Sequence, residues 1–121
     1  MGTVEFIDTS TRDGDQSLWS ATGLRTADVL QIAPAIDRVG YHALDFTAST
    51  FIGISVRFHR EDPWRRIGLM SAAVPNTPLG MITSGMRFIA WVPAGEDVMG
   101  LAFKLVARHG IRRMPLRASS R

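Results

Sequence analysis

A cluster of polar residues follows the first apolar run of the chain and carries groups suited to catalysis. Arg12 has a permanent charge that can brace an oxyanion or a carboxylate, and Asp13 offers hard oxygen atoms to a divalent cation. Gln16 can donate from its amide to a substrate carboxylate, and Gly14 lets the backbone turn without a Cβ clash. The same residue types also describe a solvated polar loop with a surface ion pair, so composition alone leaves catalysis open.

A second candidate lies near the end of another apolar run. Asp45 belongs to the segment 41–47, and in parallel α/β folds reactive groups collect at the carboxyl ends of strands. Asp45 is therefore a substrate-side candidate. The histidines have simpler interpretations: His42 as a packed or partly exposed residue, His59 as a solvated loop residue, and His109 as a cation at a helix end.

Two kinds of hydrophobic pattern alternate along the chain and predict the elements that position these residues. Strand-like runs cover 4–10, 41–47, 78–84 and 111–114, and helix-like runs cover 26–40, 62–74 and 95–110. The order β-α-β-α-β-α-β indicates a parallel sheet with right-handed crossovers. It does not separate an open doubly wound sheet from part of a barrel. A complete (β/α)8 barrel needs around 250 residues, so 121 residues hold roughly half of one.

Terminal residues support the predicted helices. Thr26 can cap the helix 26–40 and Gly40 can end it, although Pro34 lies inside. In the next helix, Asp62 suits the cap and Pro63 the first helical position. The buried face of the helix 26–40 is predicted from helical spacing to comprise Val29, Ile32, Ala33, Ile36 and Val39.

Composition removes several functional classes. The chain has no cysteine, which excludes disulfides and cysteine-based zinc sites and is compatible with a cytoplasmic location. No apolar run reaches the length of a spanning helix, so no membrane association is expected. The net charge of +3 comes from arginines spread along the chain and crowded at its end, without a nucleic-acid-binding motif, so no nucleic-acid partner is expected. Residues 115–121 are interpreted as a basic, disordered tail.

Two motifs carry a resemblance to a known superfamily. The segment "DTSTRDGDQS" (8–17) is similar to the opening motif Asp-Thr-Thr-Leu-Arg-Asp-Gly/Ala-x-Gln of the pyruvate carboxyltransferase-like barrels. That superfamily holds the carboxyltransferase domains of pyruvate carboxylase and oxaloacetate decarboxylase, 3-hydroxy-3-methylglutaryl-CoA lyase, and the isopropylmalate and homocitrate synthases. The segment "VRFHREDPWRRIGLM" (56–70) resembles Arg-Phe-x-x-Glu-Asp-Pro-Trp-x-Arg-Leu of its biotin-dependent branch.

The resemblance implies a fold, a reaction and roles for individual residues. It implies a partial (β/α)8 TIM barrel, with about the first three βα units and the start of a fourth strand in residues 1–114. Asp13 would bind a divalent metal ion such as Zn, Mn, Co or Mg, Arg12 would stabilise an enolate oxygen, and Gln16 would hold a substrate carboxylate or carbonyl. The expected substrate is a small oxo-acid of the pyruvate or oxaloacetate type. Biotin would come only on a carrier domain or another chain, since the sole lysine, Lys104, follows Phe103 rather than Met.

Departures from the family pattern keep other functions open. Asp15 stands where the condensing synthases carry Glu, which favours a synthase of the isopropylmalate or homocitrate type as an alternative. Ser84 stands where the biotin-dependent branch has an arginine that grips pyruvate, and Arg87 comes three positions later. The family's His-x-His metal ligands are absent. A further alternative is therefore a catalytically inactive truncated fragment, or a half-barrel that needs a second copy or a complementing chain.

Overall fold

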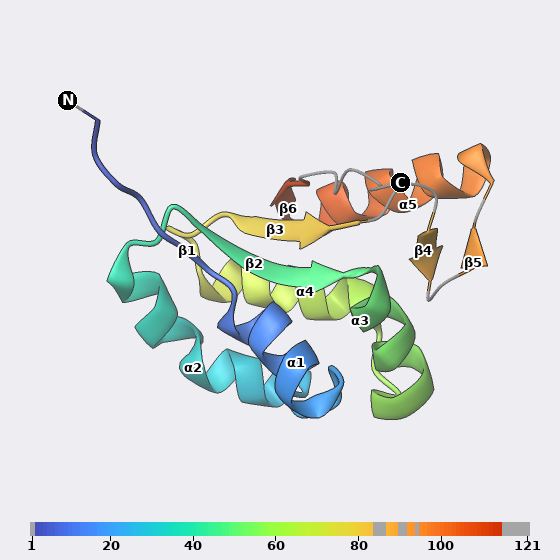
Figure 1. The fold of residues 1–121 in the computed structure, drawn as a ribbon, viewed down its shortest axis with the longest axis horizontal. Helices are drawn as coiled ribbons and strands as arrows, with labels where there is room; N and C mark the ends of the chain where they lie inside the picture. Colours follow the sequence, from blue (N-terminus) through green and yellow to red (C-terminus); the bar gives the residue numbers. More distant parts are fainter. Residues whose placement is uncertain (1, 84–86, 90–91, 94, 115–121) are drawn as a thin grey trace.

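The computed structural model describes residues 2–83, 87–89, 92–93 and 95–114. Its main feature is a parallel sheet of four strands in the order β1-β2-β3-β6 (Figure 1). The strands are Ile7–Asp8 (β1), Ala43–Ala48 (β2), Leu79–Ile82 (β3) and Ile111–Arg113 (β6). The helices Thr26–Val39 (α2), Pro63–Ala73 (α4) and Glu96–His109 (α5) connect them in turn. The predicted alternation of strands and helices is confirmed. The predicted tail at 115–121 lies outside the described residues.

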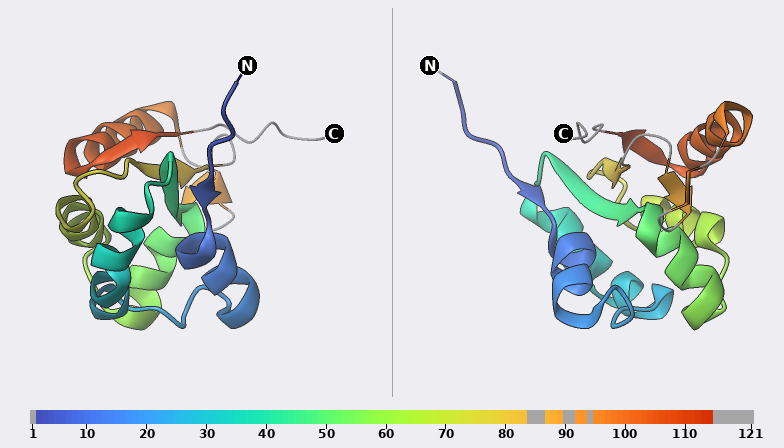
Figure 2. Two further views of the ribbon diagram at one scale, coloured as in Figure 1. Left: turned by 90° about the vertical axis from the view of Figure 1, so that its left-hand side faces the viewer. Right: turned by 45° about the vertical axis from the view of Figure 1, so that its right-hand side comes forward.

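One face of the sheet is covered by helices. Successive residues of a strand point to opposite faces of the sheet. The face that packs on the helices is formed by Leu44, Phe46, Leu79, Met81 and Ile111. Their partners include Val29 and Ala33 of α2, Ile67 and Met70 of α4, and Met99, Ala102 and Val106 of α5. Helix α4 contacts both α2 and α5, and Figure 2 shows α2 and α4 together beside the sheet. The opposite face, to which Asp45 belongs, is free of these helices.

Helix α4 forms as its terminal residues predict. The Asp62 carboxylate accepts hydrogen bonds from the backbone N–H of Trp64 at 2.9 Å and of Arg65 at 3.3 Å. These bonds satisfy two amide groups that have no partner inside the helix, and Pro63 lacks such a donor altogether. The start of α4 is therefore determined locally.

Helix α2 departs from the prediction at its start and along one edge. Arg25 rather than Thr26 is the cap residue, and its N–H donates to the Asp28 carboxylate at 2.9 Å. Ile32 is 43% exposed and Val39 is 61% exposed, although both were predicted to be buried. The buried stripe runs through Val29, Ala33 and Ile36, and at 100° per residue Ile32 and Val39 fall on its flank.

Several short elements were not predicted. Residues 10–19 form a π-helical turn, Ser10–Gly14 (η1), and a helix, Asp15–Trp19 (α1), in place of the polar loop that was the alternative to a catalytic site. Two more unpredicted elements follow β2: Ser49–Ile54 (α3) and Ser55–His59 (η2). An unpredicted antiparallel strand pair is formed by Arg87–Ile89 (β4) and Val92–Pro93 (β5). The first strand is shorter than 4–10 because η1 begins at Ser10 and β2 begins opposite Ile7.

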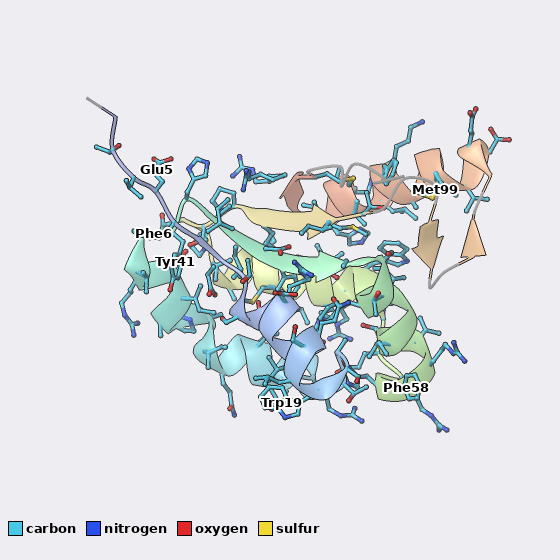
Figure 3. The ribbon with its side chains drawn as sticks, viewed as in Figure 1. Glu5, Phe6, Trp19, Tyr41, Phe58 and Met99 are labelled. Atoms are coloured by element: carbon cyan, nitrogen blue, oxygen red, sulfur yellow. The ribbon has the colours of Figure 1, made fainter. Side chains whose placement is uncertain are left out.

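Among the described residues, no helix combines the length and the apolar character that crossing a bilayer requires. Two aromatic side chains are exposed on one side of the molecule (Figure 3): Trp19 at the end of α1 is 52% exposed, and Phe58 near the end of η2 is 58% exposed.

Candidate functional site

A cavity of about 360 Å³ lies on the helix-free face of the sheet. All four strands border it, and its lining residues are Ile7, Thr9, Arg12, Asp45, Gly80, Ile82 and Arg113. Pockets of this size suit small ligands, and this one lies where α/β folds place reactive groups. Two of the predicted site residues, Arg12 and Asp45, line it.

The turn η1 positions Arg12 at this cavity. The Thr9 carbonyl accepts the backbone N–H groups of Arg12, Asp13 and Gly14 at 3.2, 2.8 and 3.1 Å, and thereby turns the chain directly after β1. The Arg12 side chain then points back over the sheet, where its Nε donates to Asp45 Oδ2 at 2.8 Å. This pair joins the turn after β1 to the middle of β2, so the sequence-based placement of Asp45 at a strand end was wrong.

Arg12 and Asp45 are shielded from water. Their side chains are only 14% and 9% exposed, so their attraction is screened less than that of a surface pair. Burial raises the pKa of Asp45, and the hydrogen bond and charge of Arg12 oppose that rise. Asp45 Oδ1 is buried and has no hydrogen-bond partner among the described residues. The Arg12 guanidinium is thus bound by Oδ2 of Asp45, while Oδ1 of the same carboxylate is buried away from water.

Gln16 contacts the same guanidinium. It lies four residues after Arg12, a spacing that puts both side chains on one face of a helical turn. Arg12 Nη1 donates to Gln16 Oε1 at 3.4 Å, which leaves the Gln16 amide N–H₂ group for another acceptor. The structure therefore brings together Arg12, Gln16 and Asp45.

Asp13 occupies a different environment from its neighbours. Its side chain is 59% exposed, and Arg12 Nη1 lies 3.5 Å from its Oδ1. A catalytic metal site needs about three protein ligands. Within the described ranges, no three His, Asp or Glu side chains are close enough to hold an ion. The described side chains thus do not fit a complete divalent metal site, and Asp13 supplies at most one ligand.

Asp15 is part of a buried network outside the cavity. It is fully buried, and its Oδ1 accepts the Gly23 N–H at 3.1 Å. Burial raises its pKa, while the hydrogen bond to Gly23 and the charges of Arg66 and His59 oppose the rise. The carboxylate anchors the loop after α1 to the helix start and does not reach the site.

His59 belongs to the same network, so its interpretation as a solvated residue was wrong. It is 7% exposed in η2, and its Nε2 lies 2.9 Å from the Thr22 carbonyl oxygen. Arg25 donates to the His59 carbonyl at 3.0 Å, and Arg66 donates to the Leu24 carbonyl at 3.2 Å. These bonds hold the loop 20–25 against η2 and α4. His42 is half exposed beside Glu5, and His109 pairs with the Leu105 carbonyl at the end of α5.

The other five lining residues were not predicted as site residues. Arg113 is the charged residue among them, and Gly80 is the one without a side chain. A usable signal existed for Arg113, because it is a charged residue at the end of a predicted parallel strand, as Asp45 is. Ser84 lies outside the described residues, and no side chain is described for Arg87.

No family model matches the sequence, whereas individual proteins do. The chain is 33% identical over 96 residues to a pyruvate carboxylase subunit from Methanocaldococcus jannaschii, an alignment that covers 79% of the chain and 17% of that protein. It is 33% identical over 105 residues to the 2-oxoglutarate carboxylase large subunit of Hydrogenobacter thermophilus, with 87% and 16% covered. It is 41% identical over 108 residues to pyruvate carboxylase of Komagataella pastoris, with 88% and 9% covered.

Solved structures agree in fold. The carboxyl transferase domain of Rhizobium etli pyruvate carboxylase with 3-hydroxypyruvate superposes with a TM-score of 0.86 at 30% identity, covering 93% of the chain and 19% of that domain. The same domain with pyruvate gives 0.86 at 28% identity, covering 96% and 20%. The chain thus spans a fifth or less of these proteins, and its four-stranded sheet is part of a (β/α)8 barrel.

Proposed function

This chain belongs to the pyruvate carboxyltransferase-like superfamily, and on that premise we propose that its cavity binds a small oxo-acid and stabilises the enolate formed beside the carbonyl. The chain would act as the N-terminal part of a carboxyltransferase or aldolase-like lyase. The observation that carries the proposal is the shielded Arg12–Asp45 pair at the cavity, 2.8 Å apart.

Arg12 has the principal chemical role. When a bond beside a carbonyl breaks, negative charge moves onto the carbonyl oxygen, and a fixed cation in a water-poor site lowers the energy of that state. Asp45 fixes the guanidinium through Nε, so Asp45 serves the substrate side by positioning Arg12. Gln16 accepts from Arg12 through Oε1, and its amide N–H₂ group is then directed to the substrate.

The metal and the carboxyl donor would come from beyond the described residues. The superfamily resemblance implies a divalent ion, but Asp13 is a single exposed ligand, so no step is assigned to a metal. A biotin carrier domain, the partner implied by the biotin-dependent branch, would deliver or accept the carboxyl group. Arg12, Gln16 and Asp45 serve to bind the oxo-acid and hold its enolate.

Enolate formation can be measured directly. Proton NMR in D₂O follows the exchange of the pyruvate methyl protons, which requires the enolate, with and without an added divalent cation. We expect Arg12→Gln to lower the exchange rate about a hundredfold, as for the loss of one oxyanion donor. Arg38→Gln removes the same charge from an exposed position on α2 and serves as the matched control. Exchange no faster than in buffer, or equal rates for both variants, would refute the proposal.

The condensing-synthase alternative receives no support from the site. It depended on Asp15 as an acidic group beside the motif, and Asp15 is buried against Gly23 instead of lining the cavity. The half-barrel alternative has one observation in its favour. Strands β1 and β6 are the outer strands of the sheet, so each leaves one edge without a partner in the part of the chain that the structure describes.

A further inference from the structure

A lateral row of residues crosses the sheet beneath the cavity. Asp45 on β2 is opposite Gly80 on β3, and Gly80 is opposite Arg113 on β6. Paired residues of neighbouring strands point to the same face, so Asp45 and Arg113 flank Gly80 on the helix-free face. The cavity is bordered by all three.

A register shift brings Arg113 to this face. Leu79 pairs with Ile111, and both face the helices, but the next residue of β3, Gly80, pairs with Arg113 rather than Arg112. Arg112 is the extra residue and is exposed. Irregularities of this kind redirect a side chain, and they are frequent beside active sites.

Gly80 leaves the space between the two charged residues empty. A Cβ placed on Gly80 would meet the carbonyl oxygens of Arg113 and Leu44 at 3.6 Å and Arg113 Cβ at 3.7 Å. These are ordinary contacts, so alanine would fit and a larger side chain would occupy the cavity.

The two arginines that line the cavity differ in whether a carboxylate neutralises their charge. Arg12 is compensated by Asp45 at 2.8 Å. Arg113 is half-buried and makes no hydrogen bond or ion pair with any residue that the structure describes; its charge acts on Asp45 only at longer range. One guanidinium on the cavity wall therefore remains free for an anion. Arginine suits a carboxylate because its planar fork can bind both oxygens.

We infer that Arg113 binds the carboxylate of the oxo-acid whose carbonyl oxygen lies at Arg12 and Gln16. The inference rests on the proposed function and adds the residue that orients the substrate. Arg113 would contact the carboxylate from β6, while the reacting carbonyl lies at the η1 side of the cavity.

The experiment compares an anion with its neutral analogue. Pyruvate and pyruvamide are titrated against the chain and its variants, and dissociation constants are obtained from ligand NMR line widths. We expect Arg113→Gln to weaken pyruvate binding at least tenfold and to leave pyruvamide binding unchanged, with Arg113→Lys in between. Arg112→Gln removes the same charge one residue earlier, and we expect less than a twofold change.

Three results would overturn the inference: no loss of pyruvate binding in Arg113→Gln, an equal loss in Arg112→Gln, or an equal loss for pyruvamide. Methyl-proton exchange in the same samples separates it from the proposed function. Arg113-dependent binding without exchange would refute the enolate function and retain the carboxylate site. Exchange with an unchanged KM in Arg113→Gln would retain the enolate function and refute the role of Arg113.

Discussion

At the scale of residues, neighbouring acids in one motif have opposite surroundings. Asp13 is 59% exposed, whereas Asp15, two positions later, is fully buried. The helical turn through η1 and α1 rotates successive side chains by about 100°, so residues two apart leave on different sides. Arg12 and Gln16, four apart, share one side of this turn and hydrogen-bond each other, and of the two Arg12 lines the cavity.

Asp15 should influence stability through its protonation. Burial raises its pKa above the ordinary 3.8, so the folded chain holds this proton more tightly than the unfolded chain does. The resulting contribution to the free energy of unfolding is complete below pH 3.8 and is lost as the pH rises through the folded-state pKa. Asp15→Asn keeps an acceptor for the Gly23 N–H but cannot ionise.

We therefore expect the stability of Asp15→Asn relative to the wild-type chain to increase with pH. Urea unfolding at a series of pH values from about 3 to 8 measures this difference. Asp97→Asn, at an exposed position in the first turn of α5, is the control for a general loss of negative charge. A stability difference that stays constant across the series would show that Asp15 is not perturbed by its burial.

At the scale of elements, α5 is joined to β6 by a turn with almost no spare room. Gly110 has φ of +130°, which side-chain-bearing residues rarely adopt, and a Cβ there would lie 2.4 Å from Ser71 Oγ of α4. This junction sets where β6 begins and hence where Arg113 lies. The position of one cavity residue thus depends on the contact between two helices and a turn.

Gly110→Ala should therefore be strongly destabilising. Backbone strain and the overlap with Ser71 together predict a loss of about 2–3 kcal/mol in the free energy of unfolding, measured by urea titration. Gly100→Ala is the matched control: it lies inside α5 with open space around it, and we expect a gain of about 0.5–1 kcal/mol. Ser71→Gly should recover part of the loss in the double variant. Equal effects at Gly110 and Gly100 would contradict this account.

At the scale of the whole molecule, the sheet has the parallel order of a barrel but is not closed by the described residues. Its outer strands β1 and β6 each have one edge that no described strand pairs with, and apolar side chains are exposed at and before β1: Val4 at 81%, Phe6 at 69% and Ile7 at 43%. Figure 3 shows Phe6 near the free N-terminal end of β1. Open edges and apolar patches favour pairing with another chain.

We expect the chain to self-associate in a concentration-dependent way through the β1 edge. Phe6→Lys places a charge there and should shift the weight-average mass in sedimentation equilibrium toward the monomer. Val98→Lys, equally a substitution of an exposed apolar residue but on α5, should leave the mass unchanged. A wild-type chain that remains monomeric and unfolds cooperatively at every concentration would exclude the need for a partner at this edge.

Local patterns in the sequence determined much of the fold. Helix α4 follows from Asp62 and Pro63, and the alternation of apolar periods predicted the parallel sheet, because caps and periodicity depend on residues only a few positions apart. The Arg12-Asp13-Gly14-x-Gln16 motif indicated the superfamily and predicted Arg12 and Gln16 as candidate site residues.

Only the tertiary structure decided which groups meet. The 2.8 Å contact of Arg12 with Asp45 joins the turn after β1 to the middle of β2, and the register shift at Arg112 puts Arg113 on the cavity wall. The burial of Asp15 and His59 depends on a loop folded back onto α4. Register and loop packing are set by contacts between distant segments, and a shift of one residue sends a side chain to the opposite face of a sheet. No local pattern contains that information.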